Sequence, residues 1–323
     1  MRTIALGGHG AALAVPMLAA LAGAAEPADT RTTALLRDPS FRQGVVVYDP
    51  APGRHVRRGV LRPDANTPPP AWGLAQWHSR FSPAGGAPQR LPGGAVRFAD
   101  AAKSVTFAGG GLVLAIDSGK EYGGRPRRKG EPWPHLLVEQ EIAACPPLTE
   151  LSAVRFRIEY RLLRCVARQP ERQDAALHAA QFQAFVTVQD RNRQSKGFGD
   201  YLWFGVPMYD SRHRSPKAYA AGDFAGSGKF ICTPAASTFT RQSAHDGQWV
   251  RIDGDLLPLI REALRTAWQR GYLKRSREPG DFRLGSFNLG WEMPGAFDAA
   301  VEVRNLALEA EATRRAPASQ PAK

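Results

Sequence analysis

The sequence predicts an all-β protein, an antiparallel β-sandwich that carries one long amphipathic helix. Three observations predict this fold. Several segments alternate apolar and polar residues with a period of two, as strands with one buried face do. The chain holds 32 Gly and 26 Pro among 323 residues, which suits a turn-rich β protein. Only one segment, near the C-terminal end, has the apolar stripe of a long helix.

The first 25 residues predict a secretory signal peptide rather than part of the fold. Arg2 gives a basic start, residues 11–22 form an apolar run, and small residues precede Glu26. No later apolar run reaches the roughly 18 residues that a membrane-spanning helix needs, so we expect no membrane span. The mature protein is therefore expected to be secreted, in the periplasm or outside the cell if the source is bacterial.

The first half of the mature chain contains short strand candidates separated by loops. After an irregular lead-in, strands are expected at 44–49, within 73–82, as three short strands over 95–116, and at 135–142. A Pro-rich passage at 62–73 and a basic stretch at 121–134 are expected to be loops.

The middle of the chain shows the clearest alternation. In residues 152–163 apolar positions alternate with Arg and Glu, which predicts a strand with one charged face. Residues 181–190 alternate apolar residues with Gln, and residues 201–208 alternate them with aromatic residues. The outer faces of these two strands therefore differ from an ordinary charged surface.

The long helix is expected within residues 253–274. Asp253 or Asp255 is the candidate N-cap, Pro258 falls in the first turn, and Gly271 is the candidate stop signal. Strands follow at 282–293 and 297–310. We expect a single domain over residues 26–310 and a disordered polar tail over 311–323.

The short alternating strands and the lone helix together favour a jelly-roll arrangement. In such a sandwich one face of each strand fills the core, and the outer face of the concave sheet can line a groove. Residues 50–75 and the basic loops are the segments that would cover it.

The chain is strongly basic, with a formal net charge of +13. Such a charge favours anionic partners such as acidic polysaccharide or an anionic envelope surface. Because Arg outnumbers Lys by 35 to 8, solvated surface arginines are an equally good reason for the charge. The chain shows no nucleic-acid motif and is predicted to be exported, so we expect no nucleic-acid partner.

Three cysteines, Cys145, Cys165 and Cys232, allow at most one intramolecular disulfide, and their spacing does not select the pair. No CxxC or Cys/His spacing indicates zinc. We expect no metal and no cofactor. The oligomeric state is left open.

Side chains expected on the outer face of the sandwich combine amides, carboxylates and aromatic rings, the groups that bind sugar hydroxyls and stack on sugar C–H faces. Arg212 and His213 would meet a carboxylate or sulfate, and Trp203→Ala is expected to abolish binding without unfolding the protein. The predicted ligand-binding residues are Glu139, Gln181, Gln183, Tyr201, Trp203, Asp210, Arg212, His213 and Glu292.

Motifs for catalysis are weak. Glu139 and Glu141 lack the central Asp of the E-x-D-x-E pattern of some sandwich glycosidases. Arg157, Glu159 and Arg161 fit the R-x-E-x-R string of some alginate lyases, but the other two segments of those lyases are missing. A Tyr209 and His213 or His178 acid–base pair is an option for lyase chemistry. No catalytic residue is therefore assigned.

Five strings make the sequence similar to an uncharacterised family of exported bacterial β-sandwich proteins. The resemblance covers about residues 70–308 and implies one concanavalin A-like or jelly-roll domain in a glycan-handling setting. It implies no activity and no catalytic residues. The strings are GLAQWHSRFS, KEYGGRPRRKGEPWPHLLVEQ, HAAQFQAFVTVQDRN, GDYLWFGVPMYDSRH and SFNLGWEMPGAFDAAVEVRNL.

The leading hypothesis is thus a secreted β-sandwich that binds polysaccharide or oligosaccharide, acidic polysaccharide among the options, in a concave groove. One alternative is a polysaccharide lyase or glycoside hydrolase on the same scaffold. Another is a non-catalytic envelope protein that its positive charge docks to an anionic surface, with binding that fades as salt rises.

Overall fold

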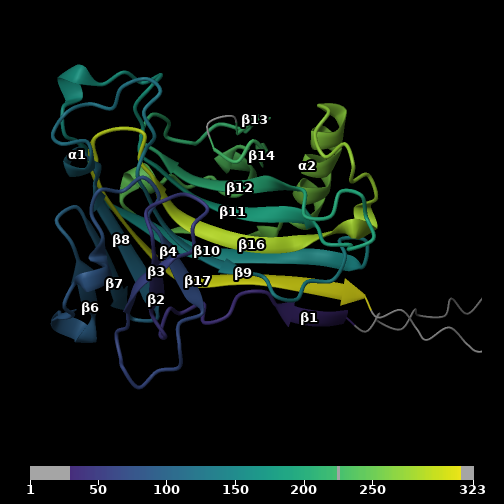
Figure 1. The fold of residues 1–323 in the computed structure, drawn as a ribbon, viewed down its shortest axis with the longest axis horizontal. Helices are drawn as coiled ribbons and strands as arrows, with labels where there is room; N and C mark the ends of the chain where they lie inside the picture. Colours follow the sequence, from purple (N-terminus) through teal and green to yellow (C-terminus); the bar gives the residue numbers. More distant parts are fainter. Residues whose placement is uncertain (1–29, 224–225, 314–323) are drawn as a thin grey trace, which may run out of the picture.

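The computed structural model describes residues 30–223 and 226–313 (Figure 1). Two sheets of largely antiparallel strands pack face to face, which confirms the predicted all-β antiparallel sandwich. The predicted signal peptide lies outside the described residues. Neither helix in the described part of the chain has the length and apolarity that a membrane crossing requires.

The first sheet has eight strands within the described residues, and we call it the eight-stranded sheet. Strand β1 (Thr30–Ala34) pairs with β17 at the side of the main path. The path runs in the order β15 (Val250–Asp255), β10 (Leu151–Ala167), β17 (Phe297–Thr313), β8 (Gly111–Asp117), β7 (Lys103–Ala108), β6 (Val96–Ala99) and β5 (Gln89–Arg90).

The second sheet, the nine-stranded sheet, carries the candidate site. Two of its pairs, β2 with β4 and β12 with β14, are parallel, and the others are antiparallel. Its order is β13 (Tyr219–Gly222), β14 (Phe230–Thr233), β12 (Tyr201–Asp210), β11 (Gln181–Asp190), β16 (Phe282–Glu292), β9 (His135–Glu141), β4 (Trp72–Ala75), β2 (Val45–Tyr48) and β3 (Arg57–Leu61).

Alternation places the apolar side chains of both sheets in one shared core. Phe182, Ala184 and Val186 of β11 are buried, while the alternating residues Gln181 and Gln183 face the other way. Contacts cross from sheet to sheet: the ring centroids of Phe156 and Phe287 lie 6.3 Å apart. The indole N–H of Trp291 donates to the Leu114 carbonyl at 3.0 Å. Trp291 is therefore a core residue.

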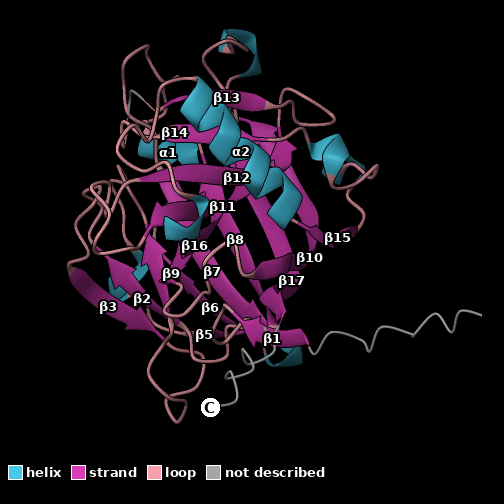
Figure 2. Cartoon of the chain, turned by 90° about the vertical axis from the view of Figure 1, so that its right-hand side faces the viewer, coloured by secondary structure: helices cyan, strands magenta, loops and turns pink. Residues whose placement is uncertain are grey.

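Two helices cover parts of the sandwich, α1 (Ser118–Glu121) and α2 (Leu257–Gln269). Helix α2 buries an apolar stripe that includes Ile260, Ala263 and Ala267 and packs on β10 and β12, one strand from each sheet. Figure 2 shows it lying across the edge of the sandwich. The Asp255 carboxylate accepts the Leu257 N–H at 2.9 Å, so Asp255 supplies the predicted cap from one position before the N-cap.

The sequence prediction was wrong at some boundaries. The expected irregular lead-in contains β1, and the tail predicted from residue 311 begins too early, because β17 continues to Thr313 and pairs there with β1. Strands β13, β14 and β15 were not predicted. They are only four to six residues long, too short to show a clear period. Residues 314–323 lie outside the described part of the chain.

The outer face of the eight-stranded sheet is a ladder of ion pairs between β10 and β17. Arg157 lies 3.2 Å from Glu309, Arg161 lies 2.7 Å from Glu302, and Glu159 lies 2.8 Å from Arg304. These contacts give the R-x-E-x-R string a structural role. Each of its three charges has a cross-strand partner, on the sheet opposite the candidate site.

Candidate functional site

The outward side chains of β11, β16, β9, β4 and β2 in the nine-stranded sheet, with the adjoining loops, form what we call the site face. The floor of this face is made of small or apolar residues. Leu137 pairs with Gly290 on one side and with Ala75 on the other. All three are buried although they face away from the core, because neighbouring side chains and loops rise around them.

Glu292, at the end of β16, anchors one polar cluster on this face. Its Oε1 accepts a hydrogen bond from the Gln183 amide at 3.0 Å, and its Oε2 accepts one from the Trp133 indole at 3.3 Å. His135, its cross-strand partner, lies 3.8 Å away. Burial raises the pKa of the Glu292 carboxyl, and the charge of Asp223 adds to the increase.

Aromatic rings surround His135. Its ring centroid lies 5.3 Å from that of Trp77 and 6.0 Å from that of Trp133, the latter in a stacked arrangement. Burial lowers the pKa of His135 to about 3, with a further contribution from His78, so the imidazole is neutral at physiological pH. His78 has a backbone φ of 59°, a strained value for a residue other than glycine.

Glu139 anchors a second cluster, on β9. Its Oε1 lies 3.4 Å from His55 Nε2, in a geometry that makes no hydrogen bond. Tyr48 lies over Gly73, the cross-strand partner of Glu139, and its ring centroid is 5.1 Å from that of His55. Burial raises the pKa of the Glu139 carboxyl. On the other side of Glu139, the Asn288 Oδ1 is also buried and unpartnered.

The register separates the two carboxylates. Glu139 pairs with Asn288, which is four residues from Glu292 along β16. Four residues of a strand span about 13 Å. The two residues therefore mark the two ends of one diagonal across the floor, with Leu137 and Gly290 between them.

The stretch from Tyr201 to His213 does not form one site. Tyr201 and Asp210 are nine residues apart on the same strand, about 30 Å. At the Asp210 end, the Arg212 guanidinium donates to both carboxylate oxygens of Asp210, at 2.9 and 2.6 Å. Gln181 also donates to Asp210, at 3.0 Å. Asp210 and Arg212 therefore neutralise each other, which makes Arg212 unsuited to the predicted role of meeting a ligand's carboxylate.

Tyr201 and Trp203 form an aromatic group at the opposite end of β12. Their centroids lie 5.4 Å apart, edge to face, and Trp203 also packs against Phe185 at 6.0 Å. The Trp203 indole donates to Ser227 Oγ at 3.1 Å, and the Lys229 ammonium lies 5.2 Å from the Tyr201 ring centroid. Both residues are half-buried on the outer side, as predicted, but far from Glu292.

The proposed acid–base pair of Tyr209 with His213 or His178 is not formed. A register shift between β11 and β12 next to Tyr209 turns its side chain toward the core, where its ring centroid lies 6.0 Å from that of Trp291. His178 is buried and its Nδ1 accepts the Asp174 N–H at 2.9 Å. His213 is half-buried in the turn that follows β12.

The structure brings together Glu139, Gln183 and Glu292 of the predicted residues, with Gln181 beside them. It adds Tyr48, His55 and Trp77, which the sequence analysis missed, and assigns Trp133, His135 and Asn288 to the same face. Alternation with buried Val47 was a signal for Tyr48. The sequence around His55 has no pattern that would predict a site residue, because His55 reaches Glu139 from an exposed loop.

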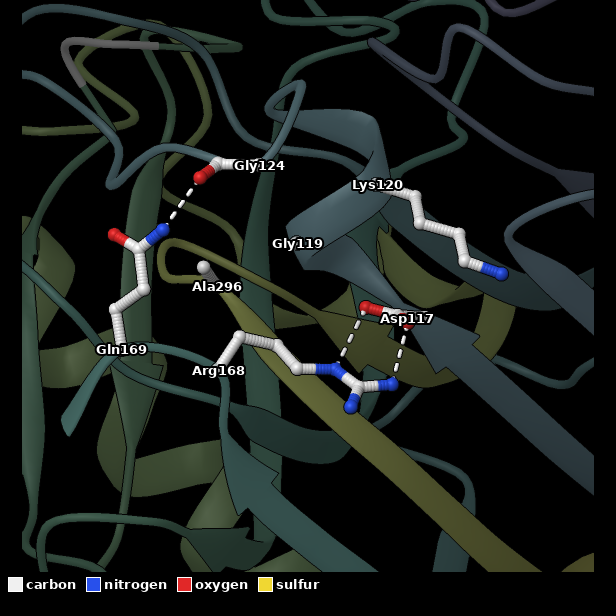
Figure 3. Close-up of a pocket in the computed structure, with 7 residues that line it drawn as sticks. All are labelled: Asp117, Gly119, Lys120, Gly124, Arg168, Gln169 and Ala296. Atoms are coloured by element: carbon white, nitrogen blue, oxygen red, sulfur yellow. Dashed lines mark hydrogen bonds and ion pairs between the residues drawn. The ribbon is translucent and has the colours of Figure 1, made fainter.

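Two cavities lie away from the site face. A pocket of about 440 Å³, shown in Figure 3, lies beside α1 and is crossed by an ion pair of 2.6 Å between Arg168 and Asp117. Another of about 390 Å³ lies over the charged face of the eight-stranded sheet, beside Arg157 and Asn305. The charged side chains that line them already have protein partners.

The described residues contain no group of three or more His, Cys, Asp or Glu side chains placed to hold a metal ion. Cys145, Cys165 and Cys232 are all free thiols in the structure.

The sequence matches no protein-family model and no curated protein. Solved structures with a similar arrangement include a cellulase derived by mutation from Cel12A of Rhodothermus marinus (11% identity, 73% of this chain and 98% of that chain, TM-score 0.40). A native family 12 xyloglucanase from Bacillus licheniformis has 6% identity over 70% of this chain and 97% of its own, with a TM-score of 0.41. A family 11 xylanase from Neocallimastix patriciarum has 7% identity over 67% and 90%, with a TM-score of 0.36. Likeness at this level carries no argument about function.

Proposed function

We propose that the site face binds carbohydrate. One observation carries the proposal: two buried acceptor atoms on this face, Glu139 Oε1 and Asn288 Oδ1, have no hydrogen-bond partner among the described residues. A buried polar atom without a partner costs free energy, so native proteins rarely keep one without a reason. A bound ligand that donates hydrogen bonds is such a reason.

The aromatic rings near these atoms support a sugar rather than another polar ligand. Tyr48 lies beside Glu139, and Trp77 and Trp133 flank His135. Aromatic faces stack on the C–H faces of pyranose rings while the polar groups take the hydroxyls. Export by the predicted signal peptide would bring the protein to polysaccharides outside the cell.

The test is affinity electrophoresis of the mature protein in gels that contain single polysaccharides, with the variant Asn288→Leu. The substitution removes an unpartnered acceptor at nearly constant volume, so we expect the fold to be kept and binding to weaken about tenfold. Thr106→Val, on the outer face of β7, is the matched control and should bind as wild type. Equal retardation of Asn288→Leu and wild type would contradict the proposal.

A glycoside hydrolase is the second candidate, because burial raises the pKa of both Glu139 and Glu292. A carboxyl whose pKa is raised holds its proton to a higher pH than usual, which is what a general acid toward a glycosidic oxygen needs. Release of reducing ends from a bound polymer, lost in Glu292→Gln with binding retained, would favour this candidate. Binding without release would favour recognition alone.

Docking by charge is the remaining alternative. It predicts that acidic polymers of any kind retard the protein, that salt abolishes the retardation, and that Asn288→Leu has no effect. A salt series of the same gels therefore separates it from binding at the site face.

A further inference from the structure

We infer that the site face selects uncharged, hydroxyl-rich glycans and excludes polyuronates. The inference rests on the proposed function and narrows its ligand class. It runs against the net charge of the chain, which favours acidic polymers. The reason lies in the hydrogen-bonding character and the charge of the floor.

The first argument concerns donors and acceptors. Glu139 Oε1 and Asn288 Oδ1 are buried acceptor atoms, and neither accepts a hydrogen bond from the described residues. A sugar hydroxyl can donate to such an atom. A carboxylate or sulfate on the ligand only accepts, so it would leave both atoms unsatisfied and bring a third acceptor beside them. The unpartnered atoms therefore match hydroxyl groups and mismatch acid groups.

The second argument concerns charge on the floor. Among the described residues, no Lys or Arg nitrogen lies within ion-pair distance of the Glu139 or Glu292 carboxylate. The two side chains are 17% and 19% exposed, so solvent screens them only in part. A uronate placed over the floor would meet two carboxyl groups whose ion-pair contacts are with histidines and not with the permanent charge of a Lys or Arg.

The third argument concerns three bases of the nine-stranded sheet and its loops that already have protein partners. Arg212 is bound to both oxygens of Asp210, and the Lys229 ammonium lies 2.5 Å from Asp200. Arg127, whose guanidinium lies 5.5 Å from the Trp133 ring centroid, donates to three backbone carbonyls, those of Pro294, Glu131 and Leu177. A ligand's carboxylate would have to displace one of these partners.

The experiment uses matched polymers. Soluble glucans, mannans and galactans are each compared with the same polymer oxidised at C6 to a uronate, in affinity gels run at low and high salt. We expect the neutral form of the preferred backbone to bind at least about tenfold more tightly than its oxidised form at high salt. At low salt the oxidised forms should gain a retardation that salt removes, because the positive surface attracts any polyanion.

Glu139→Gln identifies the cause of the selection. It keeps the size of the side chain and removes its charge, so the preference for the neutral polymer should fall several-fold as the oxidised form binds better. Glu302→Gln is the matched control on the opposite face, where Glu302 is paired with Arg161 at 2.7 Å. It should leave the preference unchanged. Circular dichroism confirms that both variants are folded.

The outcomes separate the inference from the proposed function. Salt-resistant binding of an oxidised polymer that equals the neutral form, and that Asn288→Leu weakens, would overturn the inference and keep the proposed function. If no polymer binds in a way that Asn288→Leu weakens, both are overturned. If Glu139→Gln keeps the full preference for the neutral polymer, that result would also count against the inference. The charge of Glu139 would then not be the cause of the preference.

Discussion

The charged side chains on the outer faces of the two sheets differ in burial and in pairing. On the eight-stranded sheet, Arg157 and Arg161 of β10 each have a carboxylate partner on β17 within 3.2 Å. On the nine-stranded sheet, Glu139 and Glu292 are more deeply buried and have only histidines within ion-pair distance among the described residues. Paired surface charges keep a sheet soluble at little cost. Unpaired buried carboxyls cost stability, and proteins keep such features mainly where function needs them.

The largest expected effect is on ligand binding by Trp133→Ala. The substitution removes a ring that stacks on His135 and donates to Glu292, so it takes away a stacking surface and an orienting hydrogen bond together. We expect about 2 kcal/mol or more of lost binding free energy, roughly thirtyfold in Kd. Titration calorimetry with the best-retarded polymer measures it.

Trp249→Ala is the control for that change on the other face. Trp249 lies between the guanidinium groups of Arg161 and Arg304, whose carbons are 4.9 and 3.9 Å from its ring centroid. Its loss should leave Kd unchanged. If both Trp variants weaken binding equally, the distinction between the two faces fails.

Glu139→Gln should stabilise the folded protein at neutral pH. Because burial raises the pKa of Glu139 in the folded state, the unfolded chain releases its proton first as pH rises, and stability falls from pH 4.5 up to the raised pKa. The variant lacks this loss, so we expect it to be about 1 kcal/mol more stable than wild type above the raised pKa. Below pH 4.5 the difference should disappear.

Urea unfolding of both proteins over a pH series checks this prediction. Curves of stability against pH that run parallel for wild type and Glu139→Gln would show that the carboxyl carries no such cost. A matching gain in Glu302→Gln would show that the effect is not particular to the site face.

Trp203→Ala should weaken binding less than Trp133→Ala does. Trp203 lies on the outer side of β12 but at the end remote from Glu292, against Phe185 and Tyr201. We expect about 1 kcal/mol, and only with ligands long enough to reach it. Comparing short and long oligosaccharides tests this: a full loss with short ligands would place the ring at the centre of the site instead.

Arg157→Ala should have the smallest effect. Its guanidinium is about half exposed, with 48% of the side chain accessible, and its pair with Glu309 is one of several in the ladder. We expect a loss of about 0.5 kcal/mol of unfolding free energy and no change in ligand binding. A loss of several kcal/mol would mean that the ladder acts as one cooperative network.

The sequence predicted the fold and the orientation of the central side chains, because a strand has a period of two and needs no knowledge of its neighbours. This is why Gln183, Trp203 and Glu292 were assigned to an outer face, where the structure has them. The short edge strands were missed for the same reason, since four residues hold too little of the pattern. Alternation also failed at Tyr209, where a bulge shifts the register.

The grouping of the site residues could not be predicted. Trp203 and Asp210 are neighbours in the sequence, yet seven residues of extended strand separate them by about 24 Å. Tyr48 and His55 are remote in the sequence from Glu139 and meet it because β4, which lies between β2 and β9, joins the two segments in one sheet. Proximity here depends on strand order and register, which a single sequence does not encode locally.

The position of the Tyr48 ring depends on the absence of a side chain at Gly73. A methyl group at this position would lie 2.2 Å from Cε2 of Tyr48, so the ring rests where any other residue would put its first side-chain carbon. One codon change can therefore move Tyr48 while Glu139, paired with Gly73 across the strands, keeps its backbone position. Selection can therefore act separately on stacking by Tyr48 and on hydrogen bonding by Glu139, and a lineage can lose the first while it keeps the second.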